Sequence, residues 1–263
     1  MARIEQRIVT APDRTRLVVD AIGQGRPLVI VHGSLGVAAD WHAVAHALAD
    51  DFAVFVMNRR GHGPSSDGQN YSFGREVEDI SAVMTAAGSD AALFGHSFGG
   101  ALSLAYASAT PPEALITYEP GIRLDEPIGG DAVPLVEEAL EAGDLEGGLV
   151  MGMRAFAGFD EDVIATARQS PTWKQQVAMA ATWPREMRGL DELDVSPERF
   201  ARIHSPTLLL RGTESPQWLR ETTARQARTI PDARLLDLPG QGHGANETAP
   251  LAVADAVRTF LRQ

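Results

Sequence analysis

The feature that most constrains the fold of this 263-residue chain is a regular alternation of short apolar runs with amphipathic segments. Three of the runs, at residues 27–31, 52–57 and 91–94, are continuously apolar, which is typical of strands buried on both faces of a sheet. Between the second and third runs, apolar residues recur across 77–87 at the three-and-four spacing of an amphipathic helix. This alternation predicts a mostly parallel sheet with helices on both faces.

The rest of the chain supplies five more strand candidates. Residues 4–10 and 15–20 are predicted to form an opening hairpin. Three later strand-like runs lie at residues 114–118, 207–210 and 234–238. A helix across 253–261 closes the pattern. We therefore expect an α/β fold with a sheet of eight strands.

One long interval, residues 120–205, contains no strand candidate. Helix-like stretches occupy it instead, at residues 133–141, 145–156, 160–169 and 173–187. We predict that residues 120–205 form a helical cap on a core domain made of residues 1–119 and 206–263. Such an insertion leaves the ligand site at the strand ends, beneath the cap. The apolar cap side chains that we expect to line a substrate pocket are Met151, Phe156 and Trp183.

Composition excludes several classes of protein. The chain has no cysteine, which excludes disulfides, thiolate nucleophiles and cysteine metal sites. Its formal net charge of −12 disfavours nucleic acids and anionic membranes as partners. It shows no apolar stretch long enough to span a bilayer and no signal-peptide pattern, so we expect a cytoplasmic protein. Common metal and phosphate-binding motifs are also missing from the sequence, so we expect neither a metal nor an organic cofactor.

The strongest chemical motif is Gly-His-Ser-Phe-Gly at residues 95–99. It lies between a predicted strand and a predicted helix, the context in which G-x-S-x-G forms a sharp turn that exposes its serine. Glycines two residues away on either side are needed because side chains there would clash across the turn. Ser97 is therefore the predicted nucleophile.

A serine hydroxyl needs a base before it can act as a nucleophile. His243 lies after the last predicted strand, in the glycine-rich stretch of residues 240–244. The flanking glycines allow a loop that brings its imidazole to the carboxyl ends of the strands. We predict that His243 activates Ser97.

Four landmarks occur in order along the chain: His32-Gly33 after the third strand, Arg-Arg-Gly-His-Gly at residues 59–63 after the fourth, the turn at Ser97, and the loop at His243. With them the chain resembles the α/β-hydrolase superfamily over essentially its whole length. It is similar to the capped subgroup that holds esterases, lactonases, C–C bond hydrolases and haloalkane dehalogenases. The resemblance implies an α/β-hydrolase fold.

The same resemblance implies an oxyanion hole made by the backbone amides of Ser34 and Phe98. Amides of this kind stabilise the charge that develops on the substrate carbonyl. His96, beside the nucleophile, is expected to line the pocket. His32 and His62 fall in the turn motifs, and we expect them to be structural.

The sequence offers two candidates for the acid that orients His243. In most relatives it follows the seventh strand, where this chain has Ser215 at the expected position and Glu214 beside it. Some members place it after the sixth strand, where Glu119 follows an apolar run. We favour Glu119, since a charged residue at a buried strand end needs a role, and keep Glu214 as the alternative.

These residues predict a serine hydrolase that cleaves a small ester, lactone or thioester through an acyl-enzyme. Its substrate is expected to be a small apolar carbonyl compound. The alternative is a non-hydrolytic or C–C bond-cleaving enzyme with the same triad, of the hydroxynitrile lyase, perhydrolase or cyclase type. A non-catalytic ligand receptor is a third hypothesis.

Overall fold

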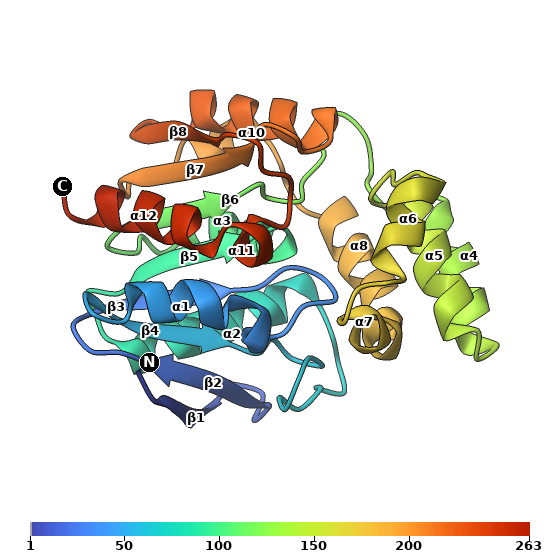
Figure 1. Cartoon of the computed structure of the whole chain (residues 1–263), viewed down its shortest axis with the longest axis horizontal. Helices are drawn as coiled ribbons and strands as arrows, with labels where there is room; N and C mark the ends of the chain where they lie inside the picture. Colours follow the sequence, from blue (N-terminus) through green and yellow to red (C-terminus); the bar gives the residue numbers. More distant parts are fainter. Residues whose placement is uncertain (1) are drawn as a thin grey trace.

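The computed structural model describes residues 2–263 and is built around one eight-stranded sheet (Figure 1). In chain order the strands are β1 (Ile4–Thr10), β2 (Arg16–Ile22), β3 (Arg26–Val31), β4 (Phe52–Met57), β5 (Ala92–His96), β6 (Leu115–Tyr118), β7 (Thr207–Gly212) and β8 (Ala233–Leu238). They lie side by side in the order β1-β2-β4-β3-β5-β6-β7-β8. β2 is antiparallel to β1 and to β4, and all other neighbours are parallel. The predicted α/β-hydrolase fold is confirmed.

Helices cover both faces of the sheet. On one face α1 (His42–Leu48) packs against α12 (Pro250–Leu261), and on the other α2 (Phe73–Ala87) packs against α3 (Phe98–Ala107) (Figure 1). Alternate side chains of a strand point to opposite faces, so each strand serves both cores. In β3, Leu28 and Ile30 join the core under α1 and α12, whereas Val29 and Val31 join the core under α2 and α3.

Three further elements complete the core of the fold. They are η1 (Ala38–Trp41), a short 3₁₀ helix before α1, α10 (Gln217–Thr229), which packs on β7 and β8, and α11 (Ala245–Thr248), which packs on α12.

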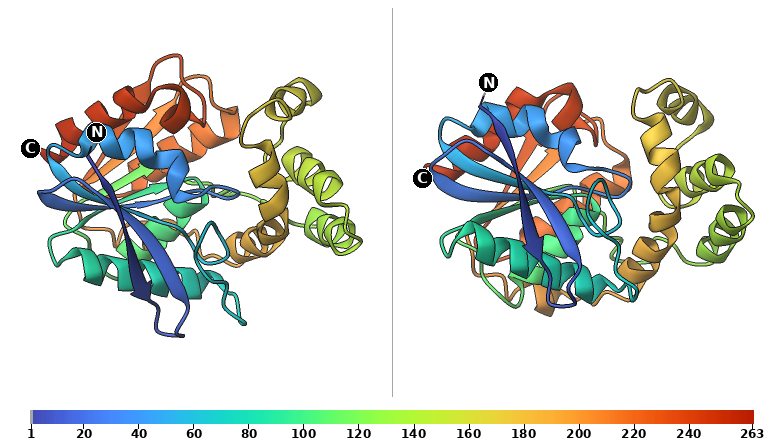
Figure 2. Two further views of the ribbon diagram at one scale, coloured as in Figure 1. Left: turned by 60° about the horizontal axis from the view of Figure 1, so that its bottom comes forward. Right: turned by 90° about the horizontal axis from the view of Figure 1, so that it is seen from below.

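Most of the helices between β6 and β7 form a separate group that stands beside the sheet (Figures 1 and 2), whereas the last of them packs on α10. In chain order they are α4 (Ala132–Glu141), α5 (Leu145–Ala155), α6 (Glu161–Ala167), α7 (Trp173–Met179), η2 (Ala180–Thr182), α8 (Trp183–Asp191) and α9 (Pro197–Phe200). The single helix expected across 173–187 is wrong, because the chain breaks at η2. Pro184 lies in the first turn of α8. A proline there begins a helix easily but cannot continue one, because it lacks an N–H group.

We call residues 132–200 the inserted helices. They fall inside the predicted cap of residues 120–205, and their role as a cap stays a prediction. Within residues 2–263, no helix is both long and apolar enough to cross a membrane. The cytoplasmic location likewise stays a prediction.

Candidate active site

Ser97 lies on the sharp turn between β5 and α3. Its backbone has φ 53° and ψ −120°, a left-handed conformation that is strained for a residue with a side chain. The two neighbouring glycines relieve the crowding that this turn creates. A Cβ atom on Gly95 would overlap the Gly99 carbonyl oxygen, and one on Gly99 would overlap the Val31 carbonyl oxygen. The turn therefore depends on both glycines and presents Ser97 above the carboxyl ends of the strands.

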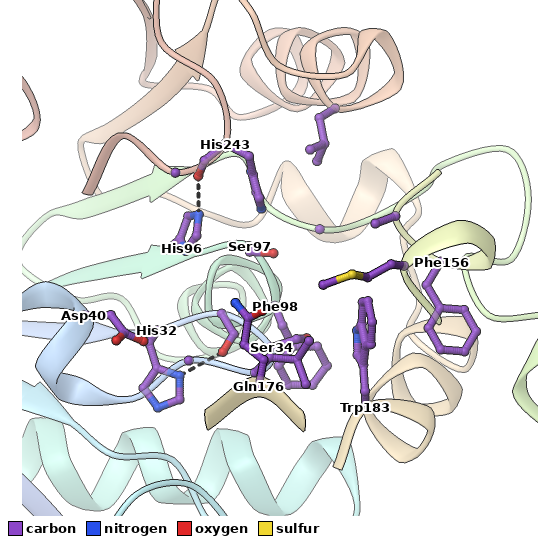
Figure 3. Close-up of a pocket in the computed structure, with 18 of the residues that line it drawn as sticks. His32, Ser34, Asp40, His96, Ser97, Phe98, Phe156, Gln176, Trp183 and His243 are labelled. Atoms are coloured by element: carbon purple, nitrogen blue, oxygen red, sulfur yellow. Dashed lines mark hydrogen bonds between the residues drawn. The ribbon is translucent and has the colours of Figure 1, made fainter. Parts of the chain in front are cut away.

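The structure brings Glu119 to His243. Glu119 follows β6, is fully buried, and has φ 44°. Its Oε2 accepts a hydrogen bond from His243 Nδ1 at 2.7 Å, and its Oε1 accepts one from the Gly212 amide at 2.7 Å. In Figure 3 the His243 ring points from the loop after β8 toward Ser97. A carboxylate, an imidazole and a hydroxyl thus follow one another at the end of the sheet.

The alternative acid, Glu214, lies elsewhere. It is exposed, and the hydrogen bond that its carboxylate accepts comes from the adjacent Thr213 hydroxyl at 3.4 Å. Its backbone amide donates to the Gln241 carbonyl, which ties the loops after β7 and β8 together. Ser215, at the position where most relatives carry the acid, is buried. Of the two glutamates, the geometry therefore favours Glu119 as the acid that orients His243.

The two predicted oxyanion donors flank Ser97. A Cβ atom on Gly33 would lie 2.8 Å from Ser97 Cβ, so the turn that carries Ser34 packs directly on the serine. Phe98 is the first residue of α3, and the amide of a first helical residue has no acceptor within its helix. Ser34 and Phe98 both line the cavity that opens at Ser97.

His96 supports the loop that carries His243. Its Nε2 donates to the His243 carbonyl oxygen at 3.0 Å, and the two rings lie 4.6 Å apart between centroids (Figure 3). Burial, reinforced by His243, holds the pKa of His96 well below its usual range, so its ring is neutral. The Tyr118 hydroxyl donates to the preceding carbonyl, that of Gly242. The sequence contained no motif that would single out Tyr118, the last residue of β6.

A cavity of about 310 Å³ opens at Ser97, between the sheet and the inserted helices. Phe156 and Trp183 line it, as expected (Figure 3). Met153 lines it as well. The expectation for Met151 is wrong, because its side chain is not among those that line the cavity. Residues two apart on a helix lie about 200° apart around its axis, so only one of these two methionines of α5 can face the cavity.

One end of the cavity is polar. The carboxylates of Asp40 and Glu247 line it, and burial raises the pKa of both, with Asp40 adding to the effect on Glu247. Gln175 and Gln176 contribute side-chain amides from α7, and the Gln175 amide lies beside the Asp40 carboxylate. No arginine or lysine is among the residues that line the cavity. The charge of this site is therefore negative or neutral.

No group of three or more histidine or acidic side chains within residues 2–263 is arranged to hold a metal ion.

Comparison with known proteins places this site in a family. Residues 28–256 match the model of the alpha/beta hydrolase family. An alpha/beta hydrolase from Sphaerobacter thermophilus has a similar structure, with a TM-score of 0.89 and 34% identity, covering 97% of this chain and 100% of that one. In sequence, the chain is 26% identical to the 2-(acetamidomethylene)succinate hydrolase of Mesorhizobium japonicum, with 94% of this chain and 92% of that protein covered.

It is also 27% identical to a non-heme haloperoxidase of Rhodococcus erythropolis, with 90% of this chain and 92% of that protein covered. The chain belongs to the alpha/beta hydrolase family.

Proposed function

We propose that this protein is a serine hydrolase that cleaves a small ester, lactone or thioester through an acyl-enzyme on Ser97. The observation that carries the proposal is the 2.7 Å contact between Glu119 Oε2 and His243 Nδ1, on an imidazole that faces a serine held in a strained turn. A carboxylate at Nδ1 keeps the proton on that nitrogen and leaves Nε2 free to accept another.

The proposed reaction has two halves. Ser97 Oγ attacks the substrate carbonyl carbon while its proton passes to His243 Nε2, and the amides of Ser34 and Phe98 bind the oxyanion. His243 then returns the proton to the leaving oxygen or sulfur as that bond breaks. In the second half water attacks the acyl carbon and gives a proton to His243. The bond between that carbon and Ser97 Oγ then breaks, His243 returns the proton to Oγ, and the acid product leaves.

The walls of the cavity indicate which substrates it favours. Its volume of about 310 Å³ suits a small ligand, and Phe156, Trp183 and Met153 supply apolar surface for an acyl group. The carboxylates of Asp40 and Glu247, with no lining arginine or lysine to offset them, repel an anionic substrate. We therefore propose a neutral apolar acyl group rather than a dicarboxylate of the kind named for the Mesorhizobium relative.

Hydrolysis of p-nitrophenyl esters of graded acyl length, with Ser97→Ala as the control, tests the proposal. We expect release of p-nitrophenol that Ser97→Ala abolishes. A properly folded wild-type protein that releases no more than the variant would contradict the proposal.

The charge preference has its own test. We expect the p-nitrophenyl ester of butyrate to be cleaved with a kcat/KM at least roughly tenfold above that of the hemisuccinate ester, because two carboxylates that line the cavity face the anion. The double variant Asp40→Asn, Glu247→Gln should reduce the difference in kcat/KM between the two esters. Equal rates on both esters would refute the charge argument while leaving Ser97-dependent hydrolysis intact.

Perhydrolysis is a second candidate, favoured by the similarity to the Rhodococcus haloperoxidase. Hydrogen peroxide would replace water in the second half and release a peroxy acid from the same acyl-enzyme. Formation of peroxy acid from acetate esters and hydrogen peroxide, measured by bromide oxidation, tests it. Faster turnover with peroxide than with water would favour this candidate over simple hydrolysis.

A further inference from the structure

Arg59 is a fully buried cation beside the two proposed oxyanion donors. It follows β4 and forms a fork with Glu76 of α2, with Nε–Oε2 and Nη2–Oε1 distances of 2.8 and 2.7 Å. Nη2 also donates to Glu186 at 2.6 Å, and Nη1 donates to the Gly33 carbonyl oxygen at 3.0 Å. The carboxylates satisfy the buried charge, whereas the contact with Gly33 acts on the turn next to Ser97.

The Gly33 carbonyl belongs to the same peptide group as the Ser34 N–H. It accepts two hydrogen bonds, from Arg59 Nη1 and from His32 Nδ1 at 2.8 Å. The Arg59 amide donates to His32 Nε2 at 3.2 Å, so this nitrogen is unprotonated and Nδ1 carries the hydrogen. Burial holds the pKa of His32 well below its usual range, in keeping with a neutral ring.

These two donors fix the orientation of the Ser34 amide. In a trans peptide the N–H points away from the C=O, and no cis peptide bond is found within residues 2–263. With the Gly33 carbonyl held toward Arg59 and His32, the Ser34 N–H is directed the opposite way. A cation that donates to the carbonyl also polarises the peptide and strengthens its N–H as a donor.

The same guanidinium contacts the residue that carries the second donor. Its central carbon lies 4.3 Å from the centroid of the Phe98 ring. Such a cation–π contact is strengthened by the exclusion of water, and the Phe98 side chain is buried. Arg59 therefore contacts the peptide group that carries the Ser34 N–H and the side chain of Phe98, whose amide is the second donor.

Glu186 connects this arrangement to the inserted helices. It lies on α8, 127 residues from Arg59 in the chain, and is fully buried. Its Oε1 accepts from Arg59, while its Oε2 has no partner within the described part of the chain. A displacement of α8 would therefore remove one of the contacts that hold the guanidinium.

We propose that Arg59 is a positioning residue of the oxyanion hole, and that Glu186 couples its position to the seating of the inserted helices on the core. The Ser34 and Phe98 amides are then fully aligned only when α8 is in place. This inference rests on the proposed serine hydrolase function.

The test compares Arg59→Lys with Arg60→Lys in the full chain, using the p-nitrophenyl ester assay. Both substitutions keep a positive charge and remove a buried fork, since Arg60 forms one with Asp79 at 2.6 and 2.8 Å. We expect Arg59→Lys to lower kcat roughly 10- to 100-fold with little change in KM. Misaligning an oxyanion donor should cost part of the rate that is lost when such a donor is deleted. Arg60→Lys should lose thermal stability with a much smaller change in kcat.

A second pair of variants tests the coupling and does not depend on whether Arg59→Lys folds. Glu186→Gln removes one of the two carboxylate charges that hold Arg59, whereas Asp67→Asn weakens another contact of α8 with the core, the ion pair between Arg185 and Asp67. We expect Glu186→Gln to lower kcat and to weaken binding of a trifluoromethyl ketone, which mimics the oxyanion, by the same factor. Asp67→Asn should change neither, because this ion pair is partly exposed and its loss is too small to displace α8.

These outcomes distinguish failure of the inference about Arg59 from failure of the proposed hydrolase function. Turnover that depends on Ser97 but falls equally in Arg59→Lys and Arg60→Lys, or that is unchanged in Glu186→Gln, would overturn the inference and leave the proposed function standing. A wild-type protein without Ser97-dependent turnover would overturn both.

Discussion

The substitution Glu119→Gln is the sharpest test of the proposed triad, because the environment of Glu119 determines what the amide must do. The carboxylate accepts two hydrogen bonds, from the Gly212 amide and from His243 Nδ1, both at 2.7 Å. A glutamine offers one acceptor oxygen and one donor NH₂ group. The backbone amide of Gly212 can only donate, so the glutamine oxygen must face it. The NH₂ group is then left facing His243 Nδ1.

The consequence is a change of tautomer. Nδ1 must become an acceptor, which moves the imidazole hydrogen to Nε2 and prevents that nitrogen from taking the proton of Ser97. In a serine protease, exchanging the corresponding acid for its amide lowers kcat by about 10⁴ with the geometry intact. We therefore expect a loss of the same order here, about 5 kcal/mol of transition-state stabilisation.

The measurement is kcat on the preferred p-nitrophenyl ester, with folding checked by circular dichroism. Glu214→Gln is the matched control, since Glu214 is exposed and does not contact His243. We expect that control to stay close to wild type. If Glu119→Gln lost less than about tenfold in kcat, or if Glu214→Gln lost more, the reasoning from tautomers would be refuted.

Three further predictions address the turn, the cavity and the pH dependence of stability. Gly99→Ala should lower the free energy of unfolding in urea by roughly 3 kcal/mol, because its new Cβ would meet rigid backbone oxygens, whereas Gly74→Ala in α2 should be neutral or stabilising; equal values would contradict the steric account. Met153→Ala should shift the ester preference toward longer acyl chains by enlarging the cavity, and Met151→Ala should not; a shift in both or neither would show that the lining is wrong. Burial raises the pKa of Asp79 to about 6, so its contribution to stability is full below the unfolded value near 3.8 and is lost as the pH rises through about 6. Asp79→Asn should therefore reduce the pH dependence of the free energy of unfolding between about pH 4 and pH 6. An unchanged pH dependence would show that Asp79 does not cause it.

Several features of the site could be read from short stretches of the chain. The strand at residues 91–94, the glycines around Ser97 and the glycine-flanked His243 each follow from a local pattern, because the turn needs small neighbours at fixed spacing. The continuous apolar runs predicted the strands, since a strand buried on both faces has no polar side. The break between α7 and α8 was missed, although Pro184 was a local signal for it.

The choice between Glu119 and Glu214 belongs to the tertiary structure. Both residues follow an apolar strand. The position of Glu119 at a buried strand end favoured it, but this local context did not exclude Glu214. Glu119 meets His243 across 124 residues because β6 lies beside β7, which places the Gly212 amide against one carboxylate oxygen and leaves the other for the imidazole.

The same limit applies to Arg59 and Met151. Arg59 stands in a recognised turn motif, but its contact with Glu186 joins residues 127 positions apart, and the orientation of α5 decided that Met153 rather than Met151 lines the cavity. The sequence by itself determined the sheet, the nucleophile and its histidine, because periodicity and turn sterics act over a few residues. The acid, the cavity wall and the support of the oxyanion donors were decided only by the tertiary structure, because their partners are distant in the chain and meet through strand order and helix packing.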